Sequence, residues 1–442
     1  MKHLIMFCPE FPPVNSTGSY RSASFARELK QLGIEPIVFS LPIHVGQQHF
    51  KRNIDVNLLR GLEDIVIHRI EASIIPGSKS FFARILNWLK ISDNVSSYID
   101  KKKLYDLTEE MVSRYQVRDI YISLPPFSIS DIAIGLSNQF GLRLITDFRD
   151  GWSTWGAGPF KSIYHFLNIK QKEKKLIKNS SHVLTVTDEL SQDILRQHQT
   201  FPQSKLSVIY NGLDDIYFNN FVVEHVINDN ALVKVGYVGS FYYYPELEKE
   251  QNKPWAMRSF SSKIKYWHRK EEWIYRSPYF FLKVISAYHT KYPDSIKFQF
   301  EYVGNMPTWL NEMINEFDLT DLFVNHGFRD KEETLGIMNT WNAILATSEN
   351  IPDGKHFCLP SKSFDNVVTG KNIFAFITSG AQEQFYRHFK QVTYFNPSNT
   401  QQNLELLRNY VINKNDHFLE QNIFPKKYTR KYQAKQLYKQ LS

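Results

Sequence analysis

Short apolar runs alternate with helical patterns along most of the chain. His3 to Cys8 form the first apolar run, and apolar residues at helical spacing follow from Ser19 to Leu32. Gly33 ends this helix and Pro36 to Leu41 start a second apolar run, so the chain opens as a β-α-β unit. Continuous apolar runs of this kind predict strands that are buried on both faces of a parallel sheet.

The alternation continues in two series. The further runs are 119–123, 142–146, 183–186 and 206–209, and then 233–240, 297–303, 343–346 and 373–377. Two doubly wound α/β domains are the simplest interpretation of the two series. We expect Rossmann-like domains over 1–215 and 216–420, and a helical segment over 421–442. Whether that segment crosses back to the first domain stays open.

Two segments depart from this pattern. Gly77 to Lys90 is amphipathic and basic. Tyr242 to Tyr275 is a long aromatic and cationic insertion directly after the Gly239-Ser240 turn.

Composition narrows the class of protein. The length of 442 residues fits two domains, and 42% hydrophobic with 22% charged residues excludes a mostly disordered chain. The net charge of +8 suits an acidic small molecule, an anionic membrane or nucleic acid equally well. Only two cysteines, Cys8 and Cys358, argue against a disulfide framework. The sequence shows no secretory signal or spanning stretch, so we expect a cytoplasmic protein.

Several motifs of known chemistry do not occur in the sequence. It has no G-x-G-x-x-G after either opening strand, no P-loop, and no H-E-x-x-H, G-x-S-x-G or D-x-D. Dehydrogenases, P-loop enzymes and manganese-dependent sugar transferases are therefore disfavoured. The remaining candidates are loops at the carboxyl ends of the expected strands, where ligands of open α/β sheets bind.

Five of these loops carry recognisable motifs, in chain order. They are Pro12-Pro-Val-Asn-Ser-Thr-Gly18-Ser-Tyr-Arg21, Asp147-Phe-Arg149-Asp150-Gly-Trp152, Asn211-Gly-Leu-Asp214, Gly236-Tyr-Val-Gly239-Ser240, and Leu359-Pro360-Ser361-Lys362-Ser-Phe-Asp365-Asn-Val-Val-Thr-Gly370-Lys371. Together they resemble the retaining glycosyltransferases of the two-domain GT-B fold, family 4, in the branch that builds bacterial surface polysaccharides. The resemblance spans nearly the whole chain, and the shared order of the motifs carries it.

The resemblance implies a first domain that binds the acceptor and a second that binds a nucleotide-sugar donor, facing each other across a cleft. It implies no metal and no cofactor besides the nucleotide-sugar substrate. The expected donor-binding residues are Gly18, Gly239, Ser240, Phe328, Arg329, Pro360, Ser361, Lys362 and Asp365. Those expected on the acceptor side are Asp147, Arg149 and Trp152, and the candidate catalytic residues are Asp150, Arg276 and Lys362.

The expected roles follow from the charge of the leaving group. A nucleotide-sugar donor leaves as a diphosphate, which Arg276, Lys362 and the Gly239-Ser240 turn would stabilise. The resemblance implies that Asp365 holds the ribose hydroxyls. Asp150 would act as a base or orient the acceptor.

Each role has a structural alternative. Arg276 competes with the insertion cations Arg258, Lys263, Lys265 and Arg269 and is otherwise a solvated surface cation. Asp365 is otherwise a capping or solvent-facing acid. In the acceptor motif, Asp147, Arg149 and Asp150 are otherwise expected to satisfy one another.

One departure from the family pattern concerns the donor sugar. Family members commonly carry two glutamates eight positions apart, whereas this chain has Phe357 and Asp365 there. The histidines nearby, His326 and His356, are expected to be packed or at the surface.

The sequence therefore predicts a cytoplasmic glycosyltransferase of capsule, O-antigen or exopolysaccharide assembly, with a glycan or lipid-linked acceptor and no nucleic acid partner. A catalytically idle GT-B binding module and a nucleotide-sugar 2-epimerase remain alternatives. Peripheral contact with an anionic membrane is expected through Gly77 to Lys90, unless that stripe packs on the protein's own core.

Overall fold

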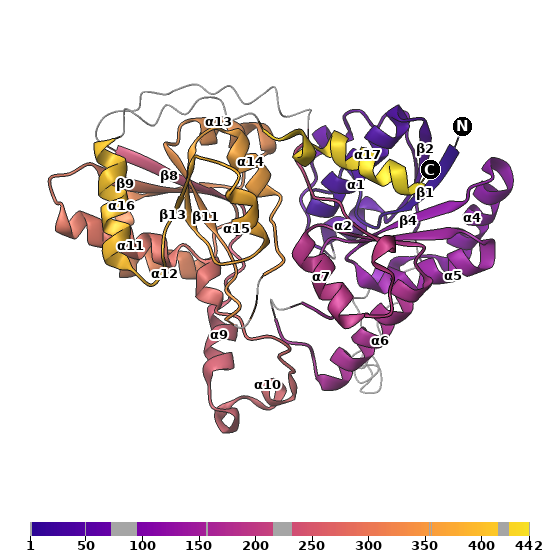
Figure 1. Cartoon of the computed structure of the whole chain (residues 1–442), viewed down its shortest axis with the longest axis horizontal. Helices are drawn as coiled ribbons and strands as arrows, with labels where there is room; N and C mark the ends of the chain where they lie inside the picture. The colour runs from indigo at the N-terminus through magenta and orange to yellow at the C-terminus, as the bar shows by residue number, and fades with distance from the viewer. Residues whose placement is uncertain are drawn as a thin grey trace. The chain divides into compact units, whose positions relative to one another are not determined.

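The computed structural model divides the chain into two compact units (Figure 1). It describes residues 2–48, 50–71, 95–155, 158–214, 232–352, 354, 356–413 and 424–441. The first unit comprises Met1–Asp214, Ile264–His268 and Lys426–Ser442, and the second comprises Asp215–Lys263 and Arg269–Pro425. The predicted membrane stripe, Gly77 to Lys90, lies outside the described residues.

The first unit is built on a seven-stranded sheet of order β3-β2-β1-β4-β5-β6-β7, in which every neighbouring pair is parallel. Its strands are β1 (Lys2–Phe7), β2 (Ile34–Ser40), β3 (Val66–Arg69), β4 (Asp119–Leu124), β5 (Arg143–Phe148), β6 (His182–Thr185) and β7 (Leu206–Val208). All six residues of β4 are buried, as expected for a central parallel strand.

The second unit contains a six-stranded parallel sheet of order β10-β9-β8-β11-β12-β13. Its strands are β8 (Leu232–Val238), β9 (Lys297–Val303), β10 (Phe323–Gly327), β11 (Ala343–Thr347), β12 (Asn372–Phe376) and β13 (Val392–Tyr394). The predicted pair of doubly wound α/β domains is thereby confirmed.

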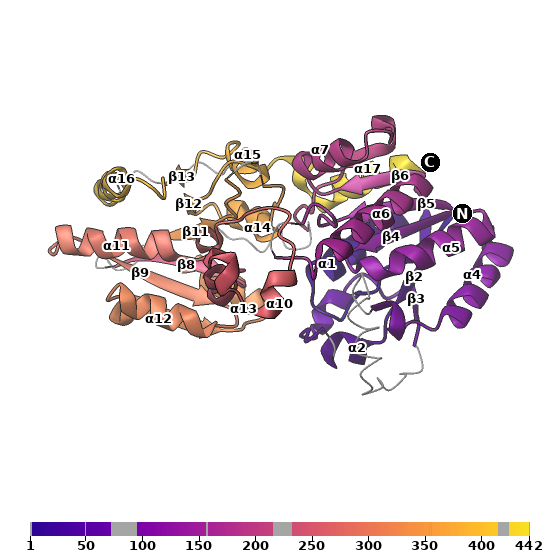
Figure 2. The ribbon, with the colours of Figure 1, turned by 90° about the horizontal axis from the view of Figure 1, so that it is seen from below.

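Helices cover both faces of each sheet (Figures 1 and 2). Those of the first unit are α1 (Thr17–Gln31), α2 (Ile43–Gln48), α4 (Lys101–Tyr115), α5 (Ser130–Phe140), α6 (Ile163–Asn179), α7 (Asp188–Gln197) and α17 (Arg430–Leu441). The others are α9 (Pro245–Asn252), α10 (Phe260–Ile264), α11 (Tyr279–Lys291), α12 (Thr308–Glu316), α13 (Lys331–Asn339), α14 (Lys362–Val368), α15 (Ala381–Tyr386) and α16 (Thr400–Ile412). No helix in the described part of the chain is long and apolar enough to cross a bilayer.

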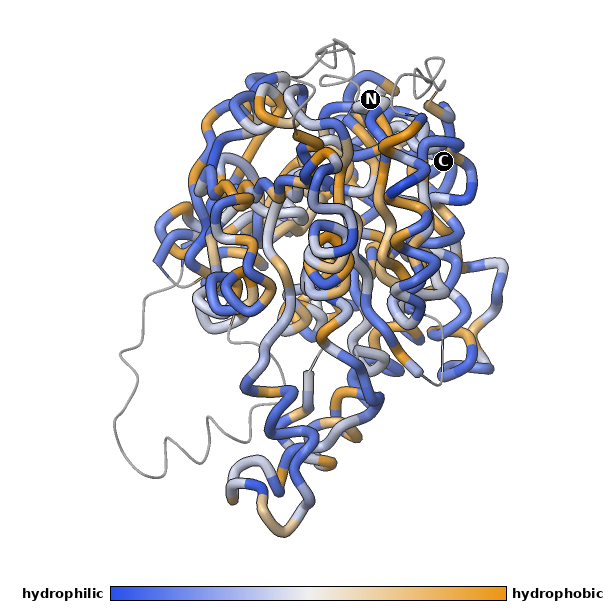
Figure 3. The backbone as a smooth tube through the Cα atoms, turned by 90° about the vertical axis from the view of Figure 1, so that its left-hand side faces the viewer, coloured by the Kyte–Doolittle hydropathy of each residue, from blue (hydrophilic) through white to orange (hydrophobic). Residues whose placement is uncertain are grey.

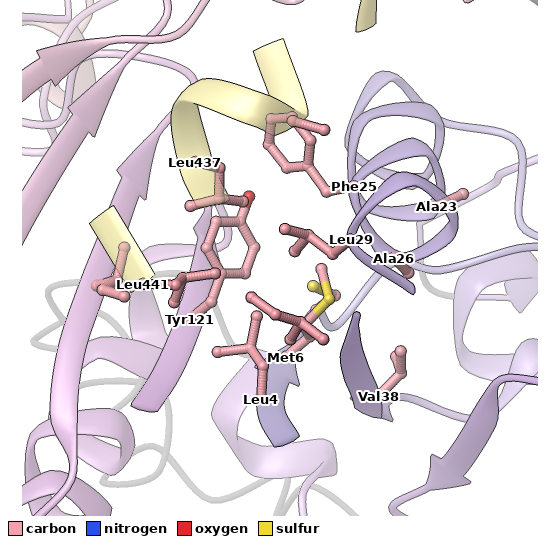
Figure 4. Close-up of a cluster of buried hydrophobic side chains, with 14 of the residues drawn as sticks. Leu4, Met6, Ala23, Phe25, Ala26, Leu29, Val38, Tyr121, Leu437 and Leu441 are labelled. Atoms are coloured by element: carbon pink, nitrogen blue, oxygen red, sulfur yellow. The ribbon is translucent and has the colours of Figure 1, made fainter. Parts of the chain in front are cut away.

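The core of the first unit joins its two ends in sequence. Leu437 and Leu441 of α17 pack in one buried cluster with Phe25 and Leu29 of α1 and Tyr121 of β4 (Figure 4). Helix α17 therefore completes the core of the first unit, although it follows the whole second unit in sequence.

The Asn-Gly-x-Asp motif at the end of the first unit receives this returning segment. Leu213 N donates to the carbonyl of Tyr428 at 2.8 Å, and Arg430 N donates to the carbonyl of Leu213 at 2.7 Å. Gly212 has φ +67°, and a Cβ there would lie 2.9 Å from the Tyr428 carbonyl oxygen, so this position requires glycine. Asp214 accepts from Arg430 Nη1 at 3.2 Å.

Part of the long insertion also belongs to the first unit. Tyr266 and Phe160 exchange two backbone hydrogen bonds, of 2.9 and 3.1 Å. The rings of Tyr266 and His268 lie 4.8 and 4.6 Å from that of Phe166. Residues Ile264–His268 thus pack on the first unit as an extended segment bridged to Phe160.

Candidate active site

Each sheet has one point where the strand order reverses. In the first sheet this point lies between β1 and β4, and in the second between β8 and β11. Ligands of open α/β sheets bind outside the carboxyl ends of the strands at such points. Each unit therefore has one candidate ligand site, at the carboxyl ends of its central strands; these two places are called the β1–β4 edge and the β8–β11 edge.

The loop after β1 in the first unit lies against Arg149. Ser16 caps α1 by accepting from Ser19 N at 3.1 Å, and Gly18 lies in the first turn of the helix. A Cβ on Gly18 would lie 2.8 Å from the guanidinium of Arg149, whose Nε also donates to Ser123 Oγ at 3.0 Å. The structure thus brings Gly18 and Arg149 together at the start of a helix.

Asp147 is enclosed in the core of the first unit. Its carboxylate accepts from Arg21 Nε at 2.8 Å, from Arg21 Nη2 at 3.0 Å and from the Tyr121 hydroxyl. The side chains of Arg21 and Asp147 are 1% and 0% exposed. Arg21 also donates to the carbonyls of Ile209 and Tyr210, both at 2.8 Å. This buried pair holds α1, β5 and the loop after β7 together.

The rest of the acceptor-side motif differs in exposure from Asp147. Asp150 is partly exposed, after the end of β5. Trp152 is buried, and its ring stacks on that of Phe127 with centroids 4.8 Å apart and an interplanar angle of 4°. Asp150 is therefore the carboxylate of this motif that has access to solvent.

In the second unit, backbone turns after three strands meet closely. Gly239 N donates to the carbonyl of Val303 at 2.8 Å, and Gly304 N donates to the carbonyl of Gly327 at 2.9 Å. A Cβ on Gly304 would lie 2.8 Å from the carbonyl oxygen of Gly239. Close approach of the turns after β8, β9 and β10 thus depends on glycine.

Lys362 lies at this edge, in the first turn of α14. Its ammonium donates to the Tyr237 hydroxyl and lies 3.8 Å from the centroid of the Tyr237 ring, which stacks on Phe241. Burial lowers the pKa of Lys362 to about 7, and Cys358 acts in the opposite direction. Lys362 forms no ion pair with any residue that the structure describes. A buried ammonium of this kind is suited to a ligand that brings negative charge.

Arg276 is buried between two carboxylates. Its Nη2 lies 3.2 Å from Glu271 Oε2 and 3.1 Å from Glu349 Oε2, and its Nε donates to Glu271 Oε1. The Arg276 side chain is only 12% exposed, so the alternative of a solvated surface cation is wrong.

Arg276 brings one positive charge to a cluster that contains two carboxyl groups, those of Glu271 and Glu349. Burial opposes the charge of Arg276, but Glu349 and Glu271 outweigh it and raise the pKa of the guanidinium. Burial raises the pKa of Glu271 to about 7, with Arg276 opposing and Glu349 adding to the shift. Two carboxylates thus share one guanidinium, and burial favours the protonated form of Glu271.

Glu349, Glu271 and Tyr237 were not expected from the sequence. Glu349 follows the buried strand β11 by two residues, and an acid at that place was the available signal. Tyr237 lies within an apolar run and is indistinguishable there from a core residue. Glu271 lies in the irregular insertion, where the pattern gives no position.

The remaining candidate donor residues lie in two separate segments of the second unit. Pro360 and Ser361 directly precede α14, and Asp365 lies in its first turn with Lys362. Phe328 and Arg329 are exposed after Gly327, the last residue of β10. Phe328 and Arg329 therefore follow the edge strand β10, which lies three positions from β11 in the strand order.

The two histidines near the motif are packed against the protein. His356 is buried, its Nε2 lies 3.2 Å from the carbonyl oxygen of Thr378, and burial lowers its pKa. His326 Nε2 lies 2.7 Å from Glu301 Oε2, which also accepts from Trp341 Nε1.

A cavity of about 630 Å³ lies beside the end of β8 in the second unit. Phe241, Tyr243 and Trp309 form its aromatic wall, and Glu312 and Glu316 line it as well. Carboxylates repel phosphate, so this cavity is poorly suited to a diphosphate. Within the described residues, no group of three or more His, Cys, Asp and Glu side chains is placed to hold a metal ion.

No protein-family model matches the sequence, and no curated protein matches it significantly. Similarity is found among solved structures. The chain is similar to HepE from Anabaena, solved with UDP, at TM-score 0.60 and 12% identity. It is similar to sucrose-phosphate synthase from Thermosynechococcus elongatus at TM-score 0.58 and 11% identity. It is also similar to the UDP-GlcNAc 2-epimerase from Neisseria meningitidis, bound to UDP-GlcNAc, at TM-score 0.53 and 11% identity.

Each of these three comparisons covers 100% of this chain and 99% of the other chain. Because the shared fold extends over the whole length of both chains, the similarity is not confined to one Rossmann-like half. The protein has the GT-B fold.

Proposed function

We propose that the protein is a retaining, metal-independent glycosyltransferase that moves a sugar from a nucleotide diphosphate to an acceptor hydroxyl in bacterial surface-polysaccharide assembly. The observation that carries the proposal is the placement of Lys362 at the β8–β11 edge, with its ammonium buried and no ion pair to a described residue. Positive charge fixed in advance at that point stabilises a departing diphosphate.

In this proposal the donor binds to the second unit. The diphosphate lies near Lys362 and the Gly239-Ser240 turn, and Arg276 contributes a second cation. Asp365 holds the ribose hydroxyls. Family members commonly carry a glutamate where this chain has Phe357. Glu349 takes the role of that glutamate, because its carboxylate follows β11 and lies beside Arg276.

The acceptor binds to the first unit, at the edge formed by Gly18, Arg149 and Asp150. Asp150 orients the attacking hydroxyl, and the leaving phosphate takes its proton. Asp147 does not contact the acceptor in this proposal, because its carboxylate is enclosed by Arg21 and Tyr121.

The comparisons support a nucleotide-sugar ligand without deciding the reaction. HepE and sucrose-phosphate synthase support transfer, whereas the epimerase from Neisseria meningitidis supports isomerisation of a donor without acceptor. The epimerase is therefore the second candidate function.

A donor screen separates these functions. The intact chain is incubated with UDP-, GDP- and dTDP-sugars, with and without a lipid-linked acceptor, and release of nucleoside diphosphate is measured. Release that needs the acceptor and is lost in Lys362→Ala supports transfer. Isomerised sugar without acceptor supports the epimerase, and binding without turnover of any donor supports an idle module.

A further inference from the structure

The insertion between β8 and α11 presents a cluster of large apolar side chains to solvent. Trp255, Met257 and Phe260 are 65%, 74% and 81% exposed. Single exposed apolar residues are ordinary, but three within six positions on one short excursion are not. Figures 1 and 3 show this excursion, with α9 and α10, projecting from the rest of the second unit, with hydrophobic positions between hydrophilic ones.

The loop that carries these side chains is held in a fixed shape. Glu250 pairs with Lys253 at 2.7 Å and accepts from Ser259 N at 2.8 Å, so it fastens both ends of the loop. Arg258 donates to the carbonyls of Lys253 and Gln251 at 3.0 and 2.7 Å. The exposed side chains are therefore presented by an ordered turn. Binding them to another surface requires little further ordering of the backbone.

Acidic residues of the excursion lie in α9, whereas the stretch with the exposed apolar side chains carries only cations. From Lys253 to Lys265 the sequence contains Lys253, Arg258, Lys263 and Lys265 and no acid. The ammonium of Lys263 lies 5.2 Å from the centroid of the Trp255 ring. Apolar and cationic groups are thus interleaved on one surface, which is the composition that binds an anionic lipid surface.

We propose that residues 253–265, here called the apolar-basic tip, dock the protein on a bilayer that contains anionic lipid. Trp255, Met257 and Phe260 enter the boundary between headgroups and acyl chains. Lys263 and Lys265 meet lipid phosphates. None of these residues is among those assigned to the reaction above, so the proposal does not depend on the reaction that the protein catalyses.

The test is co-sedimentation of the full chain with two kinds of vesicle, pure phosphatidylcholine and phosphatidylcholine with about one third phosphatidylglycerol. The triple variant Trp255→Ser, Met257→Ser, Phe260→Ser should bind the anionic vesicles at least about tenfold more weakly. The variant Lys263→Gln, Lys265→Gln should lose about tenfold on anionic vesicles and little on pure phosphatidylcholine.

The matched control replaces exposed apolar residues elsewhere. Val56→Ser and Ile412→Ser change side chains that are each 67% exposed, and this variant should bind like the unchanged protein. The apolar side chains replaced are exposed and the two lysines are only partly buried, so the thermal midpoint should move little in any variant. Quenching of tryptophan fluorescence by brominated lipid should fall in Trp255→Phe.

Three outcomes overturn the proposal. The unchanged protein fails to bind either vesicle, the triple variant binds as well as the unchanged protein, or the triple variant abolishes self-association measured without lipid. The second outcome assigns membrane contact to another surface, and the third assigns the apolar-basic tip to a second copy of the chain.

Discussion

Arg21 in the first unit and Arg276 in the second are both buried beside carboxylates, but their surroundings differ in balance. Arg21 faces one carboxylate, that of Asp147, and its other donors reach two backbone carbonyls. Arg276 faces two carboxylates, Glu271 and Glu349. A balanced, closed pair has no capacity left for a ligand, whereas an unbalanced cluster changes its protonation when a charged ligand arrives.

The comparison makes opposite predictions for the two units. Substitutions in the Arg21–Asp147 pair should reduce stability. Substitutions of Lys362 or Glu271 in the second unit should alter nucleotide binding with little loss of stability. The following four experiments test this contrast, in order of decreasing expected effect.

Arg21→Met should have the largest effect. It leaves the Asp147 carboxylate buried without its partner, which costs about 3 to 5 kcal/mol in the free energy of unfolding. Denaturant unfolding measures this loss. The double variant Arg21→Met, Asp147→Leu should lose less than the single one, and a single variant as stable as the unchanged protein would contradict the structural role.

Lys362→Met should weaken nucleotide binding without lowering stability. Loss of a charge-assisted contact costs about 1.5 to 3 kcal/mol, which is roughly tenfold to 150-fold in the Kd for UDP. The thermal midpoint should stay or rise, because burial disfavours this ammonium. Lys371→Met is the matched control, since Lys371 donates to the Asn339 carbonyl at 2.8 Å, and its Kd should not change.

Binding should depend on pH through the same lysine. The pKa of Lys362 is about 7 in the empty site, and a bound diphosphate raises it, so binding takes up a proton above pH 7. Affinity for UDP-glucose should be constant below about pH 7 and fall by up to about tenfold per pH unit above it. Calorimetry in two buffers of different ionisation enthalpy measures the uptake, which should be smaller in Lys362→Met, where Glu271 is still able to take up a proton.

Glu271→Gln should have the smallest effect. It removes one of the two carboxylates beside Arg276 and so reduces repulsion of an incoming diphosphate. We expect the Kd for UDP to fall by about threefold at pH 8, where Glu271 is ionised, and to change little at pH 6, where it is protonated. An exposed acid outside the cluster, changed in Glu332→Gln, serves as the control. Weaker binding in Glu271→Gln would show that the cluster needs both carboxylates.

The central strands of both sheets could be predicted because they are buried on both faces. Strands β1, β4, β5 and β11 are continuous apolar runs in the sequence, because nearly all of their side chains are buried. The strands β3, β10 and β13 were not predicted. They lie at sheet edges and are only partly buried, so their sequences lack a continuous apolar run.

The chemistry of the site was less accessible from the sequence. The motif around Lys362 predicted a cation after a strand of the second sheet, and the structure places Lys362 in the first turn of α14. The partners of Arg276 come from the insertion and from the loop after β11, which are 78 residues apart at Glu271 and Glu349. Likewise, the partner of Asp147 is Arg21 in another motif, 126 positions away. Pairings between distant segments follow from the folded chain and not from local spacing.

The return of α17 to the first unit has a consequence for how the protein is made. A ribosome completes β1 to β7 long before it synthesises Leu437 and Leu441, which fill the core beside α1. At about 5 to 20 residues per second, roughly 10 to 40 s pass while the second unit emerges. During that time the apolar side of α1 has no permanent cover. The nascent first unit should therefore be a substrate for chaperones until the final helix leaves the exit tunnel.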